Sequence, residues 1–169
     1  MATATLDEPL VDVPVPGDAR GLRLPHRPQA VPAARREFVE DVTDRLSLAR
    51  RHRPGAGERA ETVEDVVAGA AVVVSELLGN AVRHAQELPE GGILLRWQVR
   101  GDVVVVEITD GGGPTRVRPA RPTAFSSHGR GLRIVGALAR DWGVREGPDG
   151  RRTVWASLDG TAARSASSG

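Results

Sequence analysis

The chain contains no cysteine and no lysine, and all 23 of its basic residues are arginine. The absence of cysteine excludes a disulfide framework and any metal site built on thiolates. The absence of lysine excludes a P-loop, because the lysine of that motif contacts the phosphates. It also excludes Schiff-base chemistry and kinases that depend on a strand lysine.

The chain also lacks a strong charge imbalance and a long apolar run. Its 169 residues carry a net charge of +1, so no overall field attracts nucleic acid or a membrane surface. No uninterrupted apolar run reaches the ~18 residues of a transmembrane helix. The first residues, MATATLDEPL, have neither the basic start nor the apolar core of a secretory signal. We therefore expect a cytoplasmic protein of one domain with tails, without direct nucleic-acid or membrane contacts.

The N-terminal part is expected to begin with a disordered tail, because it is rich in proline, alanine and acidic residues. The stretch LRLPHR is typical of an edge strand, since Pro25 cannot occupy a central one. A helix follows, with Phe38, Val42 and Leu46 on its apolar face, and then a loop indicated by its glycine and proline content. The expected boundaries are 1–20 for the tail, 22–27 for the strand, 32–48 for the helix and 50–59 for the loop.

A second helix is expected from Thr62 to about Ala85. Thr62 and Asp65 resemble a capping box in front of the apolar run VVAGAAVVV. Residues three or four positions apart share a helix face, so the following SELLGNAVRHA places its polar side chains in one stripe. This stripe consists of Glu76, Asn80 and His84, with Arg83 beside it. A core helix that turns polar along one side of its last two turns indicates a site.

A hairpin with a two-residue turn at Gly101-Asp102 is expected next. Apolar residues alternate along both strands, and a two-residue turn pairs 99 with 104, 97 with 106 and 95 with 108. Asp110 has the parity of the apolar residues and is therefore predicted to point toward the helices. A carboxylate in that position is expensive unless something donates a hydrogen bond to it.

Three glycines follow Asp110, and then a long polar loop covers 114–128. A loop of that length in a compact domain is usually functional or disordered. A third helix is expected to start at Gly129, with an apolar face formed by Leu132, Val135, Leu138, Ala139 and Trp142. A turn at 148–150, a last strand and a disordered tail over 160–169 complete the chain. The grouping of elements predicts an α+β sandwich, with helices on one face of a mixed, mostly antiparallel sheet.

These pieces bring together groups suited to a nucleotide. Backbone amides at a glycine-lined helix start, here Gly129 to Gly131, form an anion site. An inward carboxylate accepts from an exocyclic amine. The amide oxygen of Asn80 suits Mg²⁺, which takes the rest of its shell from water and phosphates. The carboxylate of Glu76, one turn away, is placed to orient or deprotonate an attacking hydroxyl. Together they are the parts needed to hold and use ATP.

Three segments resemble the motifs of the GHKL (histidine kinase-like) ATPases, the superfamily of DNA gyrase and histidine kinases. SELLGNAVRHA resembles the N box, TDGGGP the adenine-binding box and SSHGRGLRIV the glycine-rich lid box. The resemblance covers about residues 22–158 and is greatest to bacterial anti-sigma-factor serine/threonine-protein kinases and their actinobacterial relatives. It implies a Bergerat-type ATP-binding fold for a domain spanning 21–159.

The resemblance also implies a role for each matching residue. Glu76 would be the catalytic base, and Asn80 would hold Mg²⁺. Asp110 would receive the adenine amine, and Gly112 would let the base approach. The remaining candidates for ATP contacts are Gly129, Arg130, Gly131 and Thr153, with Arg83 and His84 as further candidates.

The implied cofactors are ATP and Mg²⁺, and the implied partners are proteins: a sigma factor and an anti-sigma-factor antagonist phosphorylated on serine. A homodimer is a further candidate assembly. One position departs from the pattern, because Ser127 stands where related kinases can have a lid arginine. Such an arginine stabilises charge on a transferring phosphoryl group. Three functions therefore stay open: a protein-serine kinase, an ATP-gated protein-binding module without phosphoryl transfer, and a detached histidine-kinase catalytic domain.

Overall fold

A computed structural model describes residues 9–52, 61–113 and 129–159. Its strands form one sheet in the order β1-β2-β3-β4-β6-β5, and every neighbouring pair is antiparallel. The strands are β1 (Val11–Asp12), β2 (Arg20–Leu24), β3 (Ile93–Arg100), β4 (Val103–Asp110), β5 (Asp141–Glu146) and β6 (Arg152–Leu158). The α+β class is confirmed, although the described sheet has no parallel pair and is therefore not mixed.

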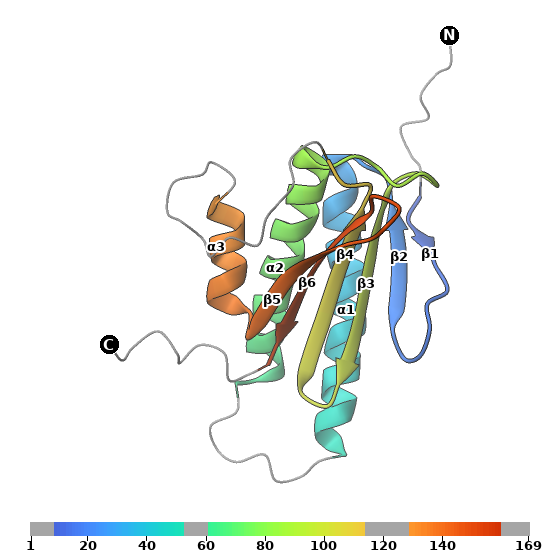
Figure 1. Ribbon diagram of the computed structural model, residues 1–169. Helices are drawn as coiled ribbons and strands as arrows, with labels where there is room; N and C mark the ends of the chain where they lie inside the picture. Colours follow the sequence, from blue (N-terminus) through green and yellow to red (C-terminus); the bar gives the residue numbers. More distant parts are fainter. Residues whose placement is uncertain (1–8, 53–60, 114–128, 160–169) are drawn as a thin grey trace.

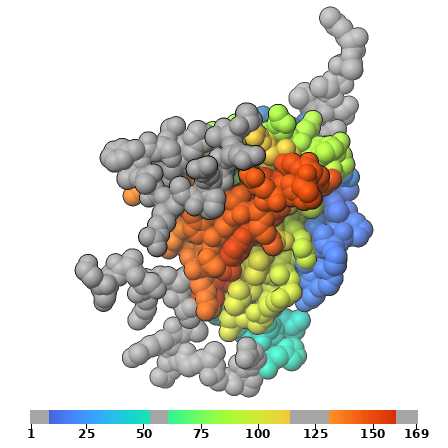
Figure 2. All heavy atoms as spheres, in the orientation of Figure 1, coloured from blue at the N-terminus to red at the C-terminus, as the bar shows by residue number. Residues whose placement is uncertain are grey.

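The described helices cover one face of this sheet, as Figure 1 shows. They are α1 (Val31–Arg51), preceded by a 3-10 turn at Pro28–Ala30, α2 (Val63–His84) and α3 (Gly129–Leu138). The opposite face of the sheet is turned toward the viewer in Figure 2, where parts of the β3–β4 segment (yellow) and of the β5–β6 segment (orange to red) are visible. The core lies between the two layers, where the helices pack on the sheet.

Helix α1 follows the sequence prediction closely. Phe38, Val42 and Leu46, spaced four residues apart, are fully buried against the sheet and α2. The helix extends from Val31 to Arg51, one residue earlier and three residues later than expected. Phe38 meets Trp97 of β3 edge to face, with ring centroids 5.6 Å apart. Helix and hairpin are thus joined through the largest side chains of the core.

Helix α2 begins with the predicted capping box. The side chain of Thr62 accepts from the backbone N–H of Asp65, and the carboxylate of Asp65 accepts from the backbone N–H of Thr62. By length and composition the helix is apolar enough to cross a membrane. Many of its apolar residues, including Val74, Leu77 and Leu78, are buried in the core, whereas Val72 is exposed. A central helix of a two-layer domain needs this composition because it contacts the sheet and helices on both sides.

The β3–β4 hairpin has the predicted register, with Val99 opposite Val104, Trp97 opposite Val106 and Leu95 opposite Ile108. All six of these side chains are buried, while the residues between them lie on the open face. This parity puts Asp110 on the helix side of the sheet, as predicted.

The N-terminal segment differs from the expectation for residues 1–20. Residues 1–8 lie outside the described residues, but Val11–Asp12 form β1 and pair with β2. The backbone N–H of Val13 also donates to the carbonyl of Gly21. Strand β2 therefore starts at Arg20 and is covered on its outer side by β1, so β2 is not the edge strand that we expected. Backbone groups of β2 that would face water are satisfied by this short neighbour.

The third helix is shorter than predicted, and Trp142 does not belong to it. Helix α3 ends at Leu138, and Trp142 lies in β5 opposite Ala156 of β6. The change of direction occurs at Arg140, whose backbone N–H donates to the carbonyl of Ser157. The backbone groups from Arg140 onward thus form hydrogen bonds with β6 in place of the bonds that a longer helix would have made. Trp142 still packs on the core from the strand, which is why its apolar spacing looked helical.

Candidate functional site

The polar stripe of α2 meets the start of α3. A Cβ atom added to Gly131 would lie 2.7 Å from Oε2 of Glu76 and 3.2 Å from Nδ2 of Asn80. Both polar side chains are half-buried. The structure therefore brings together three predicted site residues from segments about 50 positions apart in the chain, and a side chain at residue 131 would require the ends of the Glu76 and Asn80 side chains to shift.

Arg83 and His84 lie at the end of the same helix. One guanidinium nitrogen of Arg83, Nη2, donates to Oδ1 of Asn80 over 3.2 Å. This is the oxygen that the sequence assigns to a metal ion, so the Arg83 side chain must move if Asn80 binds one. The His84 side chain is exposed, and its backbone carbonyl faces Gly113, where an added Cβ would be 3.1 Å away.

Asp110 is buried at the end of β4, with 1 % of its surface exposed. Its Oδ1 accepts from the backbone N–H of Gly112 at 2.8 Å, and its Oδ2 lies 3.4 Å from Nη2 of Arg152. Burial raises the pKa of the Asp110 carboxyl above its usual range, while Arg152, the Gly112 N–H and His26 act in the opposite direction. The inward carboxylate that parity predicted is thus present, and it keeps capacity for further donors.

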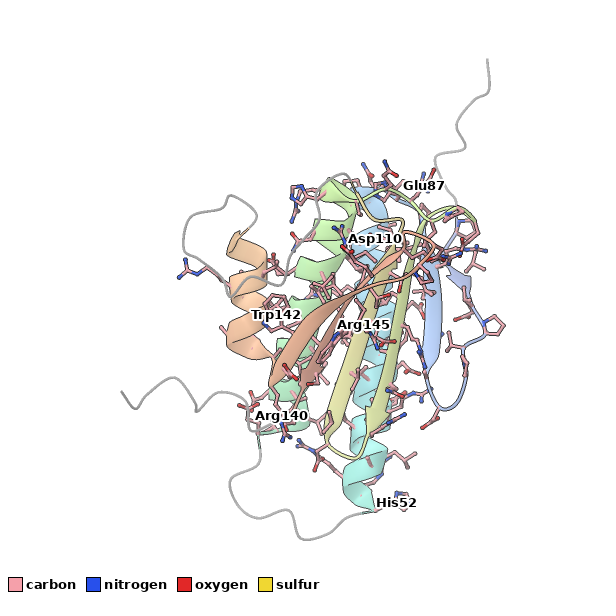
Figure 3. The ribbon with its side chains drawn as sticks, viewed as in Figure 1. His52, Glu87, Asp110, Arg140, Trp142 and Arg145 are labelled. Carbon is pink, nitrogen blue, oxygen red and sulfur yellow. The ribbon has the colours of Figure 1, made fainter. Side chains whose placement is uncertain are left out.

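The glycine run after Asp110 is held between two other segments. Gly111 donates to the carbonyl of Gln86, and Gln86 donates to the carbonyl of Gly112. A Cβ at Gly111 would lie 2.1 Å from the carbonyl oxygen of Glu87, and one at Gly112 would lie 2.5 Å from the carbonyl oxygen of Gly150. Gly112 also has φ +76°, a conformation that favours glycine. Figure 3 shows Asp110 at the end of the sheet beside the segment that carries Glu87.

Arg152 is a functional candidate that the sequence analysis missed. It is the direct cross-strand partner of Asp110, and only 8 % of its surface is exposed. Asp110 and Arg152 are the two buried charged residues of the described chain. The parity of the last strand, with Ala156 and Leu158 inward, was the available signal, because Arg152 shares that parity.

Thr153 does not join this group. It is the cross-strand partner of Thr109, and their hydroxyl oxygens lie 2.8 Å apart. Neighbouring residues of a strand point to opposite faces, so Thr153 lies on the open face while Asp110 and Arg152 lie on the helix face. The structure therefore does not place Thr153 beside Asp110, and its contribution to an adenine site stays a prediction.

The structure describes only some of the remaining predicted site residues. Helix α3 begins at Gly129, as predicted, so Gly129, Arg130 and Gly131 form its first turn. The expected polar loop over 114–128, including Ser127 and three arginines, lies outside the described residues.

The site thus has two ends along the last two turns of α2. Glu76, Asn80 and Gly131 form one end. Asp110, Gly112 and Arg152 form the other, joined to α2 by the Gln86 backbone bonds. Glu76 and His84 are eight residues apart, so the ends are separated by about 12 Å along the helix. These polar groups, on the helix side of an antiparallel sheet, define an α+β domain whose candidate site would suit an elongated polar ligand.

Comparison with known families identifies that ligand class. Residues 24–158 match the model of the histidine kinase-like ATPase domain. The chain therefore belongs to the histidine kinase-like ATPase family, and this membership implies binding of ATP and Mg²⁺. A search of curated proteins finds no match.

The described residues fit such a ligand. The buried Asp110 carboxylate suits a base amine, and Gly112 keeps the backbone free of side chains beside it. Asn80 offers an amide oxygen of the kind that Mg²⁺ accepts, next to the start of α3.

Proposed function

We propose that the protein is an ATP- and Mg²⁺-dependent protein-serine kinase of the anti-sigma-factor type. In this proposal it phosphorylates a small antagonist protein and also binds a sigma factor. The observation that carries the proposal is the contact between Glu76, Asn80 and Gly131. A domain that only bound ATP would need the amide of Asn80 and the backbone of Gly131, but it would not need a carboxylate beside them.

Each residue has a distinct task in this proposal. Asp110 accepts from the base amine and orients the nucleotide. Asn80 holds the metal ion, which supplies charge neutralisation at the phosphates when bound. Glu76 accepts the proton of the attacking serine hydroxyl, so its effect is greatest in the transition state. Gly131 lets the backbone of α3 approach both side chains.

A second candidate is a binding module in which ATP gates association with a protein and no phosphoryl transfer follows. It is favoured by Ser127, which occupies the position of a lid arginine in related kinases. A detached histidine-kinase domain has less support. Of the histidines in the described part before α2, His26 lies just after β2 with Nε2 3.1 Å from the carbonyl of Ala81, and His52 follows the end of α1. Neither lies on a pair of dimerisation helices.

The test uses the full chain, labelled ATP and Mg²⁺, with antagonist-like and sigma-like proteins encoded beside its gene as partners. The kinase proposal expects label on a serine of one partner and much slower labelling with the Glu76→Gln variant. ATP-dependent association without labelling of any partner would favour the gated module. Label on a histidine would favour the third candidate.

A further inference from the structure

Arg152 and Asp110 form a buried pair whose hydrogen-bonding capacity is not used up. The Nη2 to Oδ2 distance of 3.4 Å is long for a charged pair. Nε of Arg152 is buried, and among the buried side-chain nitrogen and oxygen atoms of the described residues it is the one without a hydrogen-bond partner. A buried donor without an acceptor destabilises a folded protein, and the penalty is larger for charged groups.

The unused groups are complementary. Arginine carries only donors, and an ionised carboxylate carries only acceptors. Oδ1 of Asp110 already accepts from Gly112, and this oxygen and Oδ2 each have lone pairs left. A ligand that satisfies both side chains must present an acceptor and a donor side by side.

An adenine ring has that arrangement. Its amine donates, and a ring nitrogen acceptor flanks the amine on either edge. We propose that Arg152 is a base-reading residue, which donates to a ring nitrogen of adenine next to the amine that Asp110 accepts. This inference rests on the proposed nucleotide site and adds a second protein contact to the base.

The position of Arg152 supports this role over a purely structural one. Other ionic contacts of the described chain lie nearer the surface, such as the pair of Arg151 and Glu90 one residue away. Arg152 instead lies on the helix face, opposite Asp110 and at the strand end where Gly112 and Gly150 meet. An ion pair serving stability alone would be expected to have its buried nitrogens satisfied.

The experiment measures binding of ATP, 1-deaza-ATP and 7-deaza-ATP to the unmodified protein and to Arg152→Met. Each analogue replaces one of the two ring nitrogens beside the amine by carbon. We expect one analogue to bind the unmodified protein about 10- to 100-fold more weakly than ATP, the usual effect of losing a hydrogen bond to a charged group. In Arg152→Met, ATP should be weakened by a similar factor, and that analogue should bind no more weakly than ATP.

Arg151→Met is the matched control, because it removes the same group from the adjacent, half-buried residue. It should leave all three affinities unchanged. The proposal is overturned if both analogues bind the unmodified protein as tightly as ATP. It is also overturned if Arg152→Met weakens all three ligands equally. The first comparison needs no variant, so a folding defect in Arg152→Met leaves it decisive.

Failure of the proposed function gives a different result. If the unmodified protein binds no ATP, the nucleotide site itself is wrong. If it binds ATP and does not distinguish the analogues, the site stands and only the base-reading role of Arg152 is lost.

Discussion

Gly131 packs so closely on Glu76 that a Cβ atom at residue 131 would lie 2.7 Å from Oε2 of the carboxylate. The two residues belong to different helices, α3 and α2, and their contact is where the polar stripe meets the glycine-rich turn. A side chain at this point must displace either the carboxylate or the start of α3.

Gly131→Ala should therefore gain less stability than an alanine normally brings to a helix. Glycine to alanine inside a helix stabilises by up to ~1 kcal/mol when there is room. Because the short contact involves the far end of Glu76, the full gain should return in the Glu76→Ala background. Urea unfolding of both single variants and the double variant measures this coupling. Gly69→Ala is the control, since its Cβ would meet Leu158 at an ordinary 3.9 Å. Strict additivity of the two changes would show that the contact is not made in solution.

Asn80→Ala should abolish the effect of Mg²⁺ on ATP binding. The amide oxygen of Asn80 lies at the start of α3, where phosphates are expected, and now accepts from Arg83. Calorimetry should show tighter ATP binding with Mg²⁺ than with EDTA for the unmodified protein, and equal binding for the variant. If the unmodified protein binds ATP equally well with Mg²⁺ and with EDTA, Asn80 is not a metal ligand.

Asp110→Asn should weaken ATP binding by roughly 1–3 kcal/mol, because one acceptor oxygen becomes a donor facing the base amine.

The ionisation of Asp110 also predicts that ATP affinity depends on pH. Burial raises the pKa of Asp110, so protonation begins at a higher pH than in an exposed aspartate. The affinity should be constant above that pKa and fall as the pH is lowered through it. Titration of the nucleotide affects both proteins equally, so the difference in ATP binding free energy between the unmodified protein and Asp110→Asn reports on Asp110 alone. A difference that does not become smaller as the pH is lowered would contradict this role.

Glu76→Gln should separate chemistry from binding. The substitution preserves size and removes the base, so ATP affinity should barely change. Phosphorylation of a cognate partner should fall by about 10²–10⁴-fold, the usual contribution of a positioned base. Single-turnover transfer and nucleotide titration on the same preparation measure both quantities. Transfer at the unmodified rate would exclude Glu76 as the base.

Thr153→Val should leave ATP affinity unchanged, because Thr153 lies on the open face of the sheet. Loss of its hydrogen bond with Thr109 should lower the free energy of unfolding by about 0.5–1.5 kcal/mol. Thermal unfolding and nucleotide titration test the two parts separately. A tenfold loss of ATP affinity would return Thr153 to the site.

Local patterns in the sequence determined much of the fold. Alternation along two strands joined by a two-residue turn predicted the β3–β4 register and the inward direction of Asp110, and both are observed. The capping box at Thr62 and the four-residue spacing in α1 placed two helices. These signals are reliable because each arises from residues within a few positions of one another.

Contacts between distant segments were decided by the tertiary structure alone. The meeting of Gly131 with Glu76 and Asn80 depends on how α3 packs on α2. The pairing of Asp110 with Arg152, and that of Thr153 with Thr109, depend on the register between β4 and β6. A shift of one residue in that register would turn Arg152 to the open face and Thr153 to the helix face. The alternation along β6 shows which of its residues share a face. Which residue lies opposite Asp110 depends on the packing of the whole sheet, and this packing places an arginine beside the buried carboxylate.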